Sequence, residues 1–415
     1  MPQLLTDKNS NINLKNIKSL IKKYESPFWV YDSDMIHKKI NLLKQFDIIR
    51  FAQKACSNIH ILRIMKKNKV KIDAVSLGEI ERALVAGFKP KNNEIIFTAD
   101  IIDQDTLSKI VDLKIPVNVG SLDMLTQIGK RSPGHHIWIR INPGFGYGHS
   151  KKTNTGGENS KHGIWSPDLA IPIIQKYQLK LIGLHMHIGS GVNYTHLKKV
   201  CKSMTENAIK LKQKISFISA GGGLPIPYKV NEKPMDVKKY FELWNDSRNK
   251  ISNFLGQNIQ LEIEPGRFLV AESGILISQI RAIKQMGNKN FVLIDAGFND
   301  LMRPTMYGSY HHISIIPKND RYINEKKTIE TVIAGPLCES GDVFTQTNKG
   351  DLETRKLPIT QVGDYVVFHD TGAYGASMSS NYNTRPLIQE ILLEKNHFRT
   401  IRRRQTIKEL LNLEI

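Results

Sequence analysis

Residues 72–88 read IDAVSLGEIERALVAGF and contain one complete strand–helix unit. The run IDAV (72–75) is short and apolar, as expected for a strand that is buried on both faces. The residues after it repeat apolar side chains at three- and four-residue steps, at Leu77, Ile80, Leu84 and Phe88. That spacing predicts an amphipathic helix. Ser76 and Glu79 fit a capping box at its start, and Gly87 is a suitable stop.

The same alternation extends in both directions along the chain. Eight short apolar runs, separated by stretches of helical period, occupy residues 48–52, 72–75, 95–99, 115–119, 137–141, 181–187, 215–220 and 259–264. Eight strand–helix units in series favour a closed (β/α)8 barrel of the TIM type over an open doubly wound sheet. We therefore predict an α/β fold whose barrel occupies residues 33–275.

The pattern changes after residue 275. The segments ILISQIRAIKQ, NFVLIDAG, TIETVIAGP and GDYVVFHD are typical of strands that are separated by turn residues and not by long helices. They predict a second, antiparallel β domain, either a sandwich or a Greek-key barrel. We expect PFWVYD (27–32) to add a strand to it, so that residues 1–32 and 276–415 form this domain. A helix at 405–413 should close the chain.

The composition limits the class of protein. Hydrophobic residues make up 40% and charged residues 24% of the 415 residues, and no apolar run reaches the roughly 18 residues of a membrane span. The chain opens with neither the basic region nor the apolar core of a secretory signal. Three cysteines are too few for a disulfide framework or a zinc site, which favours a reducing cytoplasm and no metal. The net charge of +20 accompanies no nucleic-acid-binding signature, so we expect neither a nucleic-acid nor a membrane partner.

Chemically versatile side chains follow the predicted strands, at the end of a barrel where enzymes of this fold carry their active sites. They are Lys54, Asp73, Arg140, His185, His187, the glycines at 221–223, Glu264 and Arg267. Together they suit pyridoxal phosphate, which needs a Schiff-base lysine, a partner for its ring nitrogen and a phosphate cradle. Each has a plain structural alternative, such as a lysine that extends its amine to solvent, a core histidine or an ion pair. His185 and His187 could form a metal pair, but no third ligand lies at suitable spacing.

An ordered series of motifs runs through nearly the whole chain. It consists of FWVYD, FAQKACSN, DAVSLGEIERA, NTGGENSKHGI, HMHIGSG, GGGLPIPY, EPGRFLV, DAGFNDLMRPTMYG, GPLCESGDVF and DTGAYGASMSSNYN. In this order the motifs resemble those of the fold-type III pyridoxal phosphate-dependent decarboxylases, and most closely those of the diaminopimelate decarboxylase family. Cys56, His162 and Gly191 stand where many members have asparagine, phenylalanine and glutamine. None of these departures removes a catalytic group.

The resemblance implies roles for individual residues. Lys54 would bind the cofactor as a Schiff base, and Cys338 would donate the proton that replaces the lost carboxylate. His187 would stack on the cofactor ring, and Glu264 would pair with the ring nitrogen. The residues expected around the cofactor are Lys54, Asp73, Arg140, His187, Ser190, Gly223, Glu264, Gly266, Arg267 and Tyr374. Those expected around the substrate are Arg267, Arg303, Tyr307, Glu339 and Tyr374.

The resemblance also implies a reaction, the decarboxylation of meso-2,6-diaminopimelate to L-lysine and carbon dioxide in the last step of lysine biosynthesis. Diaminopimelate carries an ammonium and a carboxylate at the end far from the reaction, and Glu339 and Arg303 would bind these two groups. A homodimer is implied as well, in which Cys338 enters the neighbouring subunit's site and the β domain completes the active site and the dimer interface. The alternatives are a decarboxylase of ornithine, arginine or carboxynorspermidine, an amino-acid racemase, and a catalytically silent regulator of the same fold.

Overall fold

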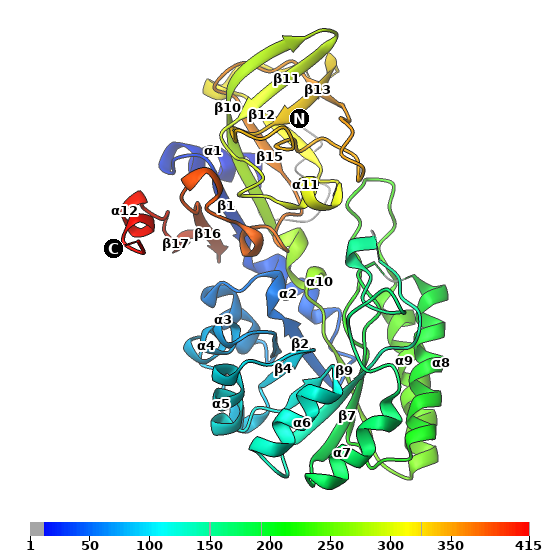
Figure 1. Cartoon of the computed structure of the whole chain (residues 1–415). Helices are drawn as coiled ribbons and strands as arrows, with labels where there is room; N and C mark the ends of the chain where they lie inside the picture. Colours follow the sequence, from blue (N-terminus) through cyan, green and yellow to red (C-terminus); the bar gives the residue numbers. More distant parts are fainter. Residues whose placement is uncertain (1–11, 149–150, 192, 325, 415) are drawn as a thin grey trace. The chain divides into compact units, whose positions relative to one another are not determined.

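The computed structural model describes residues 12–148, 151–191, 193–324 and 326–414, which form two compact units (Figure 1). The barrel unit consists of residues 40–226 and 234–268. The β-domain unit consists of the residues before it, the residues after it and the inserted segment 227–233. The barrel predicted from the sequence spans residues 33–275, which is longer at both ends. The prediction also includes 227–233, because no sequence signal separates this segment from the barrel. Residues 1–11 of the predicted β domain lie outside the described residues.

Among the described residues, eight parallel strands pair in sequence order, and the pairing of the last with the first closes a barrel. The strands are β2 (Ile48–Ala52), β3 (Lys71–Ala74), β4 (Ile95–Ala99), β5 (Val117–Val119), β6 (His136–Ile141), β7 (Lys180–Met186), β8 (Phe217–Ser219) and β9 (Gln260–Ile263). The predicted (β/α)8 barrel is therefore confirmed.

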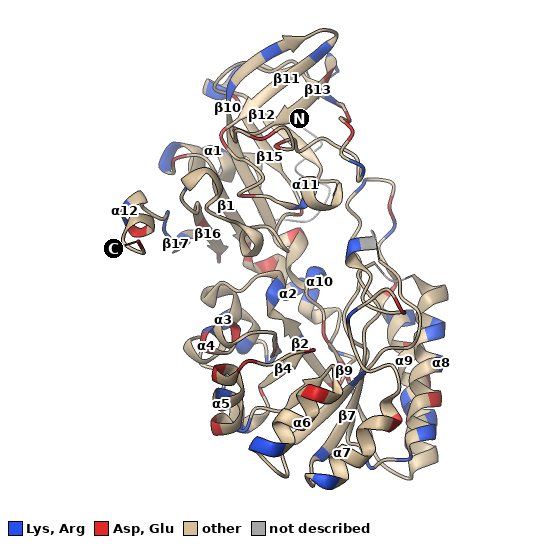
Figure 2. Cartoon of the chain, in the orientation of Figure 1, with Lys and Arg blue, Asp and Glu red and all other residues tan. Residues whose placement is uncertain are grey.

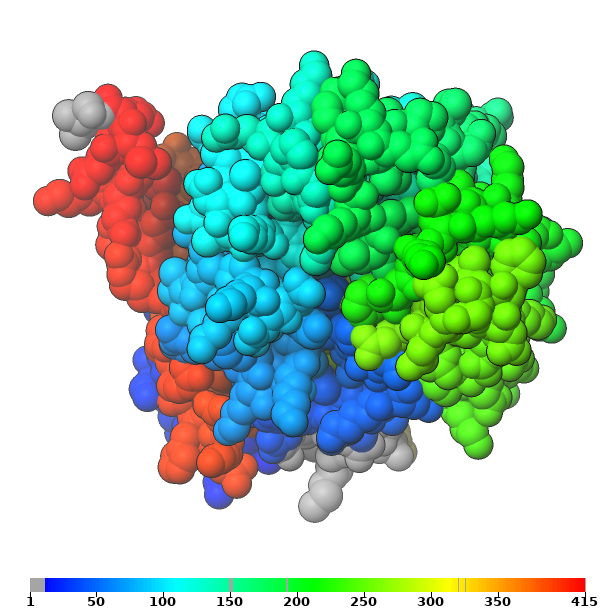
Figure 3. Space-filling view, turned by 90° about the horizontal axis from the view of Figure 1, so that it is seen from below, coloured from blue at the N-terminus to red at the C-terminus, as the bar shows by residue number. Residues whose placement is uncertain are grey.

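Helices connect the barrel strands. They are α3 (Ile59–Lys67), α4 (Leu77–Val85), α5 (Gln104–Leu113), α6 (Leu122–Arg131), α7 (Ala170–Lys176), α8 (Tyr194–Leu211) and α9 (Val237–Leu255), and the short α10 (Arg267–Val270) follows β9. Seen from below in Figure 3, the segments coloured from blue through cyan to yellow-green succeed one another in a ring. This is the outer layer of helices that a TIM barrel requires.

The ends of α4 show how local sequence delimits an element. The Ser76 hydroxyl accepts a hydrogen bond from the Glu79 N–H at 3.2 Å, as the capping pattern predicts. The Glu79 carboxylate accepts from the Val75 N–H at 2.9 Å, so the return bond of the box is made one residue earlier. Gly87 follows the helix with φ of +97°, a left-handed conformation that favours glycine. The helix therefore ends where the sequence predicts.

A glycine makes room for a tryptophan between two neighbouring barrel strands. Trp138 in β6 pairs with Gly183 in β7, and its buried ring stacks on Phe217 of β8 with ring centroids 5.5 Å apart. A Cβ atom on Gly183 would lie 2.5 Å from the Trp138 ring. The ring fits because residue 183 has no side chain.

The β-domain unit contains, among its described residues, a nine-stranded sheet. Its strands are β1 (Phe28–Asp32), β10 (Gly274–Met286), β11 (Lys289–Ile294), β12 (Ile313–Ile316), β13 (Thr328–Ala334), β14 (Arg355–Pro358), β15 (Tyr365–Phe368), β16 (Gln389–Glu394) and β17 (His397–Arg402). β1 lies between β10 and β16, so the extra strand predicted from PFWVYD is confirmed. Most pairs are antiparallel as predicted, but β1 runs parallel to β16 and β11 runs parallel to β13. The sheet is therefore mixed.

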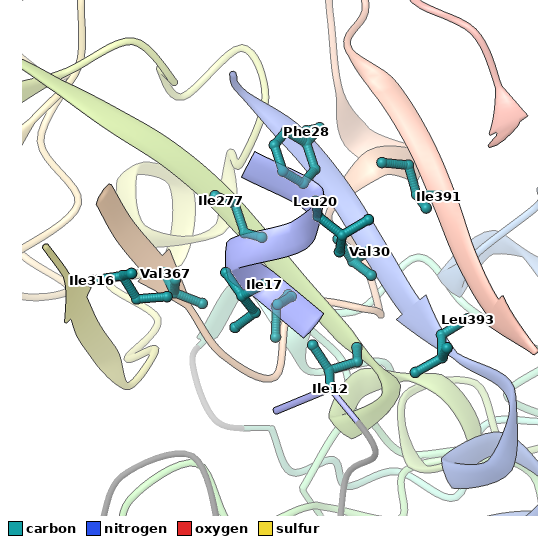
Figure 4. Close-up of a cluster of buried hydrophobic side chains, with 11 residues drawn as sticks. Ile12, Ile17, Leu20, Phe28, Val30, Ile277, Ile316, Val367, Ile391 and Leu393 are labelled. Carbon is teal, nitrogen blue, oxygen red and sulfur yellow. The ribbon is translucent and has the colours of Figure 1, made fainter. Parts of the chain in front are cut away.

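The helices assigned to this unit are short. They are α1 (Leu14–Lys23), the greater part of α2 (Ser33–Asn41), α11 (Arg303–Tyr307) and α12 (Ile407–Leu411), the last of which lies inside the helix predicted at 405–413. Figure 4 shows how α1 packs on the sheet through Ile17 and Leu20. They contact alternate residues of the strands, such as Phe28 and Val30 of β1, because successive strand side chains point to opposite faces.

Lysine and arginine residues are spread along the ribbon of both units (Figure 2). α8 alone carries Lys198, Lys199, Lys202 and Lys210. Within the described part of the chain, no helix combines the length and the apolar character needed to cross a membrane.

Candidate active site

The carboxyl ends of the barrel strands bring together residues that the sequence singles out. Lys54 lies in the short 3-10 turn Gln53–Ala55 directly after β2, and its side chain is exposed. The positive charge of Lys54 lowers the pKa of Asp73 in β3 and the pKa of His187, which follows β7. The negative charge of Glu264, which follows β9, raises the pKa of Asp73. Four strands that are far apart in the sequence therefore place these four side chains at one end of the barrel.

Glu264 is buried, and two side chains hold its carboxylate. His185 donates from Nε2 to one carboxylate oxygen at 2.8 Å, and the Ser219 hydroxyl donates to the other at 2.9 Å. Burial raises the pKa of Glu264, but the charge and hydrogen bond of His185, the hydrogen bond of Ser219 and the charge of Arg50 together lower it below the ordinary value. Glu264 is therefore an ionised carboxylate that is itself shielded from solvent.

Asp73 has the opposite protonation state. Burial, followed by the negative charge of Glu264, raises the pKa of Asp73 to about 8, against the lowering effects of Lys54 and of a hydrogen bond with Thr98. Its Oδ1 atom has no hydrogen-bond partner among the described residues. At neutral pH the two carboxyl groups therefore differ, because Asp73 keeps a proton and Glu264 does not.

His187 presents an uncharged imidazole. Burial, together with the positive charges of Arg140 and Lys54, lowers the pKa of His187 well below its ordinary value. Its Nδ1 atom is buried and has no hydrogen-bond partner among the described residues. A neutral ring of this kind suits stacking on a planar aromatic group. Among the described residues, no three histidine, cysteine, aspartate or glutamate side chains gather closely enough to hold a metal ion.

The glycine run after β8 forms a tight cradle. Gly223 has a left-handed φ of +97°, and a Cβ atom on Gly222 would lie 2.7 Å from the Glu264 carbonyl oxygen. The Gly223 carbonyl accepts from the Gly191 N–H at 2.9 Å, which joins the cradle to the loop that contains Ser190. Backbone in this arrangement can approach a phosphate group closely, as side chains would not allow.

Several supporting residues were not predicted. His185 and Ser219, which fix Glu264, stood in the strand-end runs without an assigned role. The Asp100 carboxylate accepts from His162 Nδ1 at 2.6 Å and from the Gly163 N–H at 2.9 Å, and so joins the loop after β4 to the loop after β6. The negative charge of Asp100 also raises the pKa of the buried Arg140, against the larger lowering effect of burial. The position of Asp100 directly after a predicted strand was the one signal that could have identified it.

The other predicted residues divide between the two units. Gly266 and Arg267 follow Glu264 in the barrel unit, and Arg267 is 8% exposed. Those in the β-domain unit are Arg303, Tyr307, Cys338, Glu339 and Tyr374. Arg303 and Tyr307 begin and end α11, and Arg303 is buried. Tyr374 follows β15 in the turn DTGAYG and is half-buried.

Cys338 lies on a turn that the Asp342 carboxylate stabilises. The Asp342 carboxylate accepts from the N–H groups of Phe298 and Leu337, both at 2.7 Å. The Cys338 N–H donates to the Asn383 side chain at 3.0 Å, and the Cys338 side chain is exposed. The motif CESGD thus presents its thiol to solvent from a fixed backbone.

The barrel-unit residues fit pyridoxal phosphate. Lys54 offers an exposed amine, Glu264 an ionised carboxylate, and His187 an uncharged imidazole. The glycines at 221–223 add a backbone cradle. These are the chemical functions that the cofactor requires of a protein, namely a Schiff-base amine, a ring-nitrogen partner, a stacking group and a phosphate site.

Comparison with known proteins points to the same cofactor. The family model described as the pyridoxal binding domain of pyridoxal-dependent decarboxylases matches residues 33–271. A diaminopimelate decarboxylase of Buchnera aphidicola subsp. Schizaphis graminum is 76% identical over 100% of both chains. A crystal structure of a diaminopimelate decarboxylase has a TM-score of 0.96 and 58% identity, covering 100% of this chain and 99% of that one.

A more distant structure has the same fold. The Helicobacter pylori diaminopimelate decarboxylase, described as complexed with L-lysine, has a TM-score of 0.82 and 31% identity. The match covers 96% of this chain and 99% of that one. On the strength of the family model and of relatives that match over their full length, the chain belongs to the diaminopimelate decarboxylase family of pyridoxal-dependent decarboxylases.

Proposed function

We propose that the chain decarboxylates meso-2,6-diaminopimelate to L-lysine and carbon dioxide, using pyridoxal phosphate, as the last step of lysine biosynthesis. The observation that carries this proposal is the buried, ionised Glu264 beside Lys54, His187 and the protonated Asp73. The names of the relatives and the L-lysine bound to the Helicobacter pylori protein support the choice of substrate.

The barrel residues bind and orient the reacting groups. When bound, pyridoxal phosphate supplies an electron sink for the electron pair that the departing carboxylate leaves behind. Glu264 holds a proton on the ring nitrogen, because an ionised carboxylate favours the charged form of a neighbouring base. His187 stacks on the ring, Lys54 provides the amine that anchors the cofactor, and the cradle at 221–223 receives the phosphate.

The remaining cofactor residues complete the binding. Asp73 and Arg140 contribute polar groups near the amine and the ring hydroxyl. The residues assigned to the region of the phosphate are Ser190, Gly223, Arg267 and Tyr374, and Gly266 is assigned to the cofactor without a more specific place. The hydrogen bond that joins the loops of Ser190 and Gly223 supports the assignment of these two residues.

Cys338 delivers the proton that takes the place of the carboxylate. A thiol suits this role, because its S–H group can donate a proton to a neighbouring reacting atom. We assign it to the neighbouring subunit's site, so that the active form is a homodimer. The exposed position of Cys338 on a rigid turn supports this arrangement. Three free cysteines support a reducing cytoplasm as the location.

The β-domain residues bind the far end of the substrate. Arg303 binds the distal carboxylate, since a planar guanidinium matches a carboxylate with two parallel hydrogen bonds. Glu339 binds the distal ammonium, and Tyr307, Arg267 and Tyr374 complete the pocket. A decarboxylase of ornithine or arginine has no distal carboxylate to bind and would not need Arg303.

Release of carbon dioxide from three substrates tests the proposal. We expect the protein to act on meso-diaminopimelate and to leave L-ornithine and L-arginine essentially unchanged. Lys54→Ala should abolish the activity and also the visible absorbance of the bound cofactor. Faster turnover of ornithine or arginine would overturn the substrate assignment. A colourless protein that releases carbon dioxide from none of the three would identify a regulator.

A further inference from the structure

The segment Pro227–Lys233, which follows the phosphate cradle along the chain, belongs to the β-domain unit. Its turn is built by its own residues. The N–H groups of Tyr228 and Lys229 both donate to the Glu232 carboxylate, at 2.8 and 3.3 Å. The Glu232 N–H donates back to the Lys229 carbonyl at 3.1 Å. These bonds fix the backbone that carries Tyr228.

The Tyr228 ring packs against the arginine assigned to the substrate. The Arg303 guanidinium carbon lies 4.9 Å from the centre of the Tyr228 ring, and Arg303 is 4% exposed. The His311 ring meets the Tyr228 ring edge to face, with centroids 5.5 Å apart and an interplanar angle of 85°. A cation above an aromatic face is bound more strongly when solvent is excluded. Tyr228 therefore restricts the position of the Arg303 guanidinium from one side.

His311 fixes the same guanidinium from its edge. His311 Nε2 lies 2.8 Å from Arg303 Nη1, and His311 Nδ1 lies 2.8 Å from the His369 carbonyl oxygen. A carbonyl only accepts, so Nδ1 carries the ring hydrogen. A guanidinium only donates, so Nε2 offers its lone pair to Arg303. His311 is therefore uncharged in this contact.

Both of these partners hold Arg303 without carrying a negative charge. An aspartate or glutamate could hold the guanidinium equally well, but it would compete with a substrate carboxylate for the same positive charge. A neutral imidazole and an aromatic ring restrict the side chain and leave its charge in place. An arginine that is already ordered loses less conformational freedom when a ligand binds.

We propose that Tyr228 and His311 are positioning residues that set the specificity for a substrate with a distal carboxylate. They act through Arg303 and make no part of the chemical step. This inference rests on the proposed function, in which Arg303 binds that carboxylate. It predicts an effect on the binding of one functional group, with the rate of the bound substrate left intact.

A matched pair of ligands isolates that group. L-Lysine and 1,5-diaminopentane differ only in the carboxylate of lysine, so the ratio of their inhibition constants measures the contribution of the distal subsite. We expect Tyr228→Leu and His311→Leu to raise KM for diaminopimelate and the inhibition constant of L-lysine by about tenfold each, with kcat within about twofold. The inhibition constant of 1,5-diaminopentane should not change. Arg303→Ala sets the upper limit of the effect.

Conservative variants separate positioning from packing. Tyr228→Phe keeps the aromatic face, and His311→Gln keeps an acceptor near the position of Nε2, so both should restore most of the L-lysine affinity. If His311→Leu does not fold, His311→Asn takes its place, because it keeps a donor for the His369 carbonyl and loses the acceptor for Arg303. The cofactor absorbance of each variant reports that the barrel is intact.

The outcomes separate this inference from the proposed function. A wild-type protein that does not turn over diaminopimelate refutes the proposed function. A wild-type protein that does so, with an unchanged L-lysine to diaminopentane ratio in the Leu or Asn variants, overturns the positioning role alone. An equal loss of affinity for both ligands also overturns it, because the effect would then not concern the carboxylate.

Discussion

Glu264 depends on residues that are distant in sequence. Its two oxygens accept from His185 and Ser219, which lie 79 and 45 residues before it. Below them, Arg50 forms a two-point ion pair with the fully buried Glu262, with N–O distances of 2.7 and 3.0 Å. Glu264, the acid that we assign to the ring nitrogen of the cofactor, is thus part of an ordered polar network at the end of the barrel. Such a network fixes both the orientation and the charge of its members.

Removing His185 should change the charge of Glu264. Without the His185 hydrogen bond and charge, burial dominates and the pKa of Glu264 rises, so His185→Leu weakens the hold on the ring-nitrogen proton. We expect kcat to fall by about tenfold or more, with a shift of the nitrogen-15 resonance of the bound cofactor toward its unprotonated value. Ser219→Ala, which removes one neutral donor, should have a smaller effect. An unchanged resonance in His185→Leu would contradict the role given to this histidine.

Asp73 should destabilise the cofactor-free protein as the pH rises. Its pKa is about 8 when folded and ordinarily about 3.9 when unfolded, so between these values the folded state binds the additional proton. Stability is therefore lost as the pH increases through this window. Asp73→Asn should be more stable than the wild type at pH 8.5, by on the order of a few kcal/mol, with the difference vanishing toward pH 4.

Urea unfolding of the cofactor-free protein at several pH values measures this difference. The exposed Asp123 on α6 provides the matched control, Asp123→Asn. A gain in Asp73→Asn that does not depend on pH would show that the buried charge is not its cause.

At the scale of elements, the barrel strands were predictable because each is a short apolar run buried on both faces. The observed strand ends differ from the predicted ones where local hydrogen bonds determine the backbone conformation. The run predicted at 115–119 becomes a strand only at Val117, because Ile115 still donates to Ile110 of α5 and Pro116 has no N–H. The parallel pairing of β1 with β16 was not predictable, since no local pattern encodes the direction of a partner from the other end of the chain.

The candidate site likewise has residues that the sequence could identify and contacts that it could not. Lys54, Asp73, His187 and Glu264 could be named from the sequence, because residues at the ends of barrel strands meet whatever the intervening lengths. The support of Glu264 by His185, and of Arg303 by Tyr228, could not be named. Such contacts depend on side-chain directions after the strands have closed, and no spacing in the sequence specifies them.

The β6–β7 pair provides a test of packing within an element. Gly183→Val would place its side chain in the Trp138 ring, and we expect it to destabilise the protein by about 1–3 kcal/mol. A Cβ atom on Gly78 in α4 would lie 4.0 Å from the Ser76 hydroxyl, its nearest neighbour apart from the backbone of the helix itself. Gly78→Ala should therefore be neutral or stabilising, by up to about 1 kcal/mol. Denaturant unfolding of the two variants checks this, and equal stabilities would contradict the packing argument.

At the scale of the whole molecule, the proposed homodimer places each Cys338 in the partner's site. Lys54→Ala and Cys338→Ala should then be nearly inactive as separate proteins. If they are mixed, unfolded and refolded together, half of the dimers should be mixed, and each of these should contain one intact site. We expect about a quarter of the wild-type activity to return.

The same experiment can contradict the shared site. If Cys338 served the Lys54 of its own chain, no mixed dimer would contain an intact site and no activity would return. Refolding each variant alone provides the control, and light scattering of the mixture shows whether dimers have formed.

The place of β1 in the sheet has a consequence for synthesis on the ribosome. All five residues of β1 are buried between β10 and β16, yet β1 emerges before the barrel and both of its neighbours emerge after it. The newly made strand has no partner until β10 has been synthesised, and its pairing with β16 must wait until translation is almost complete. A chain released early would expose the FWVYD segment as an unpaired apolar strand that promotes aggregation. The cell must therefore shield or degrade truncated products.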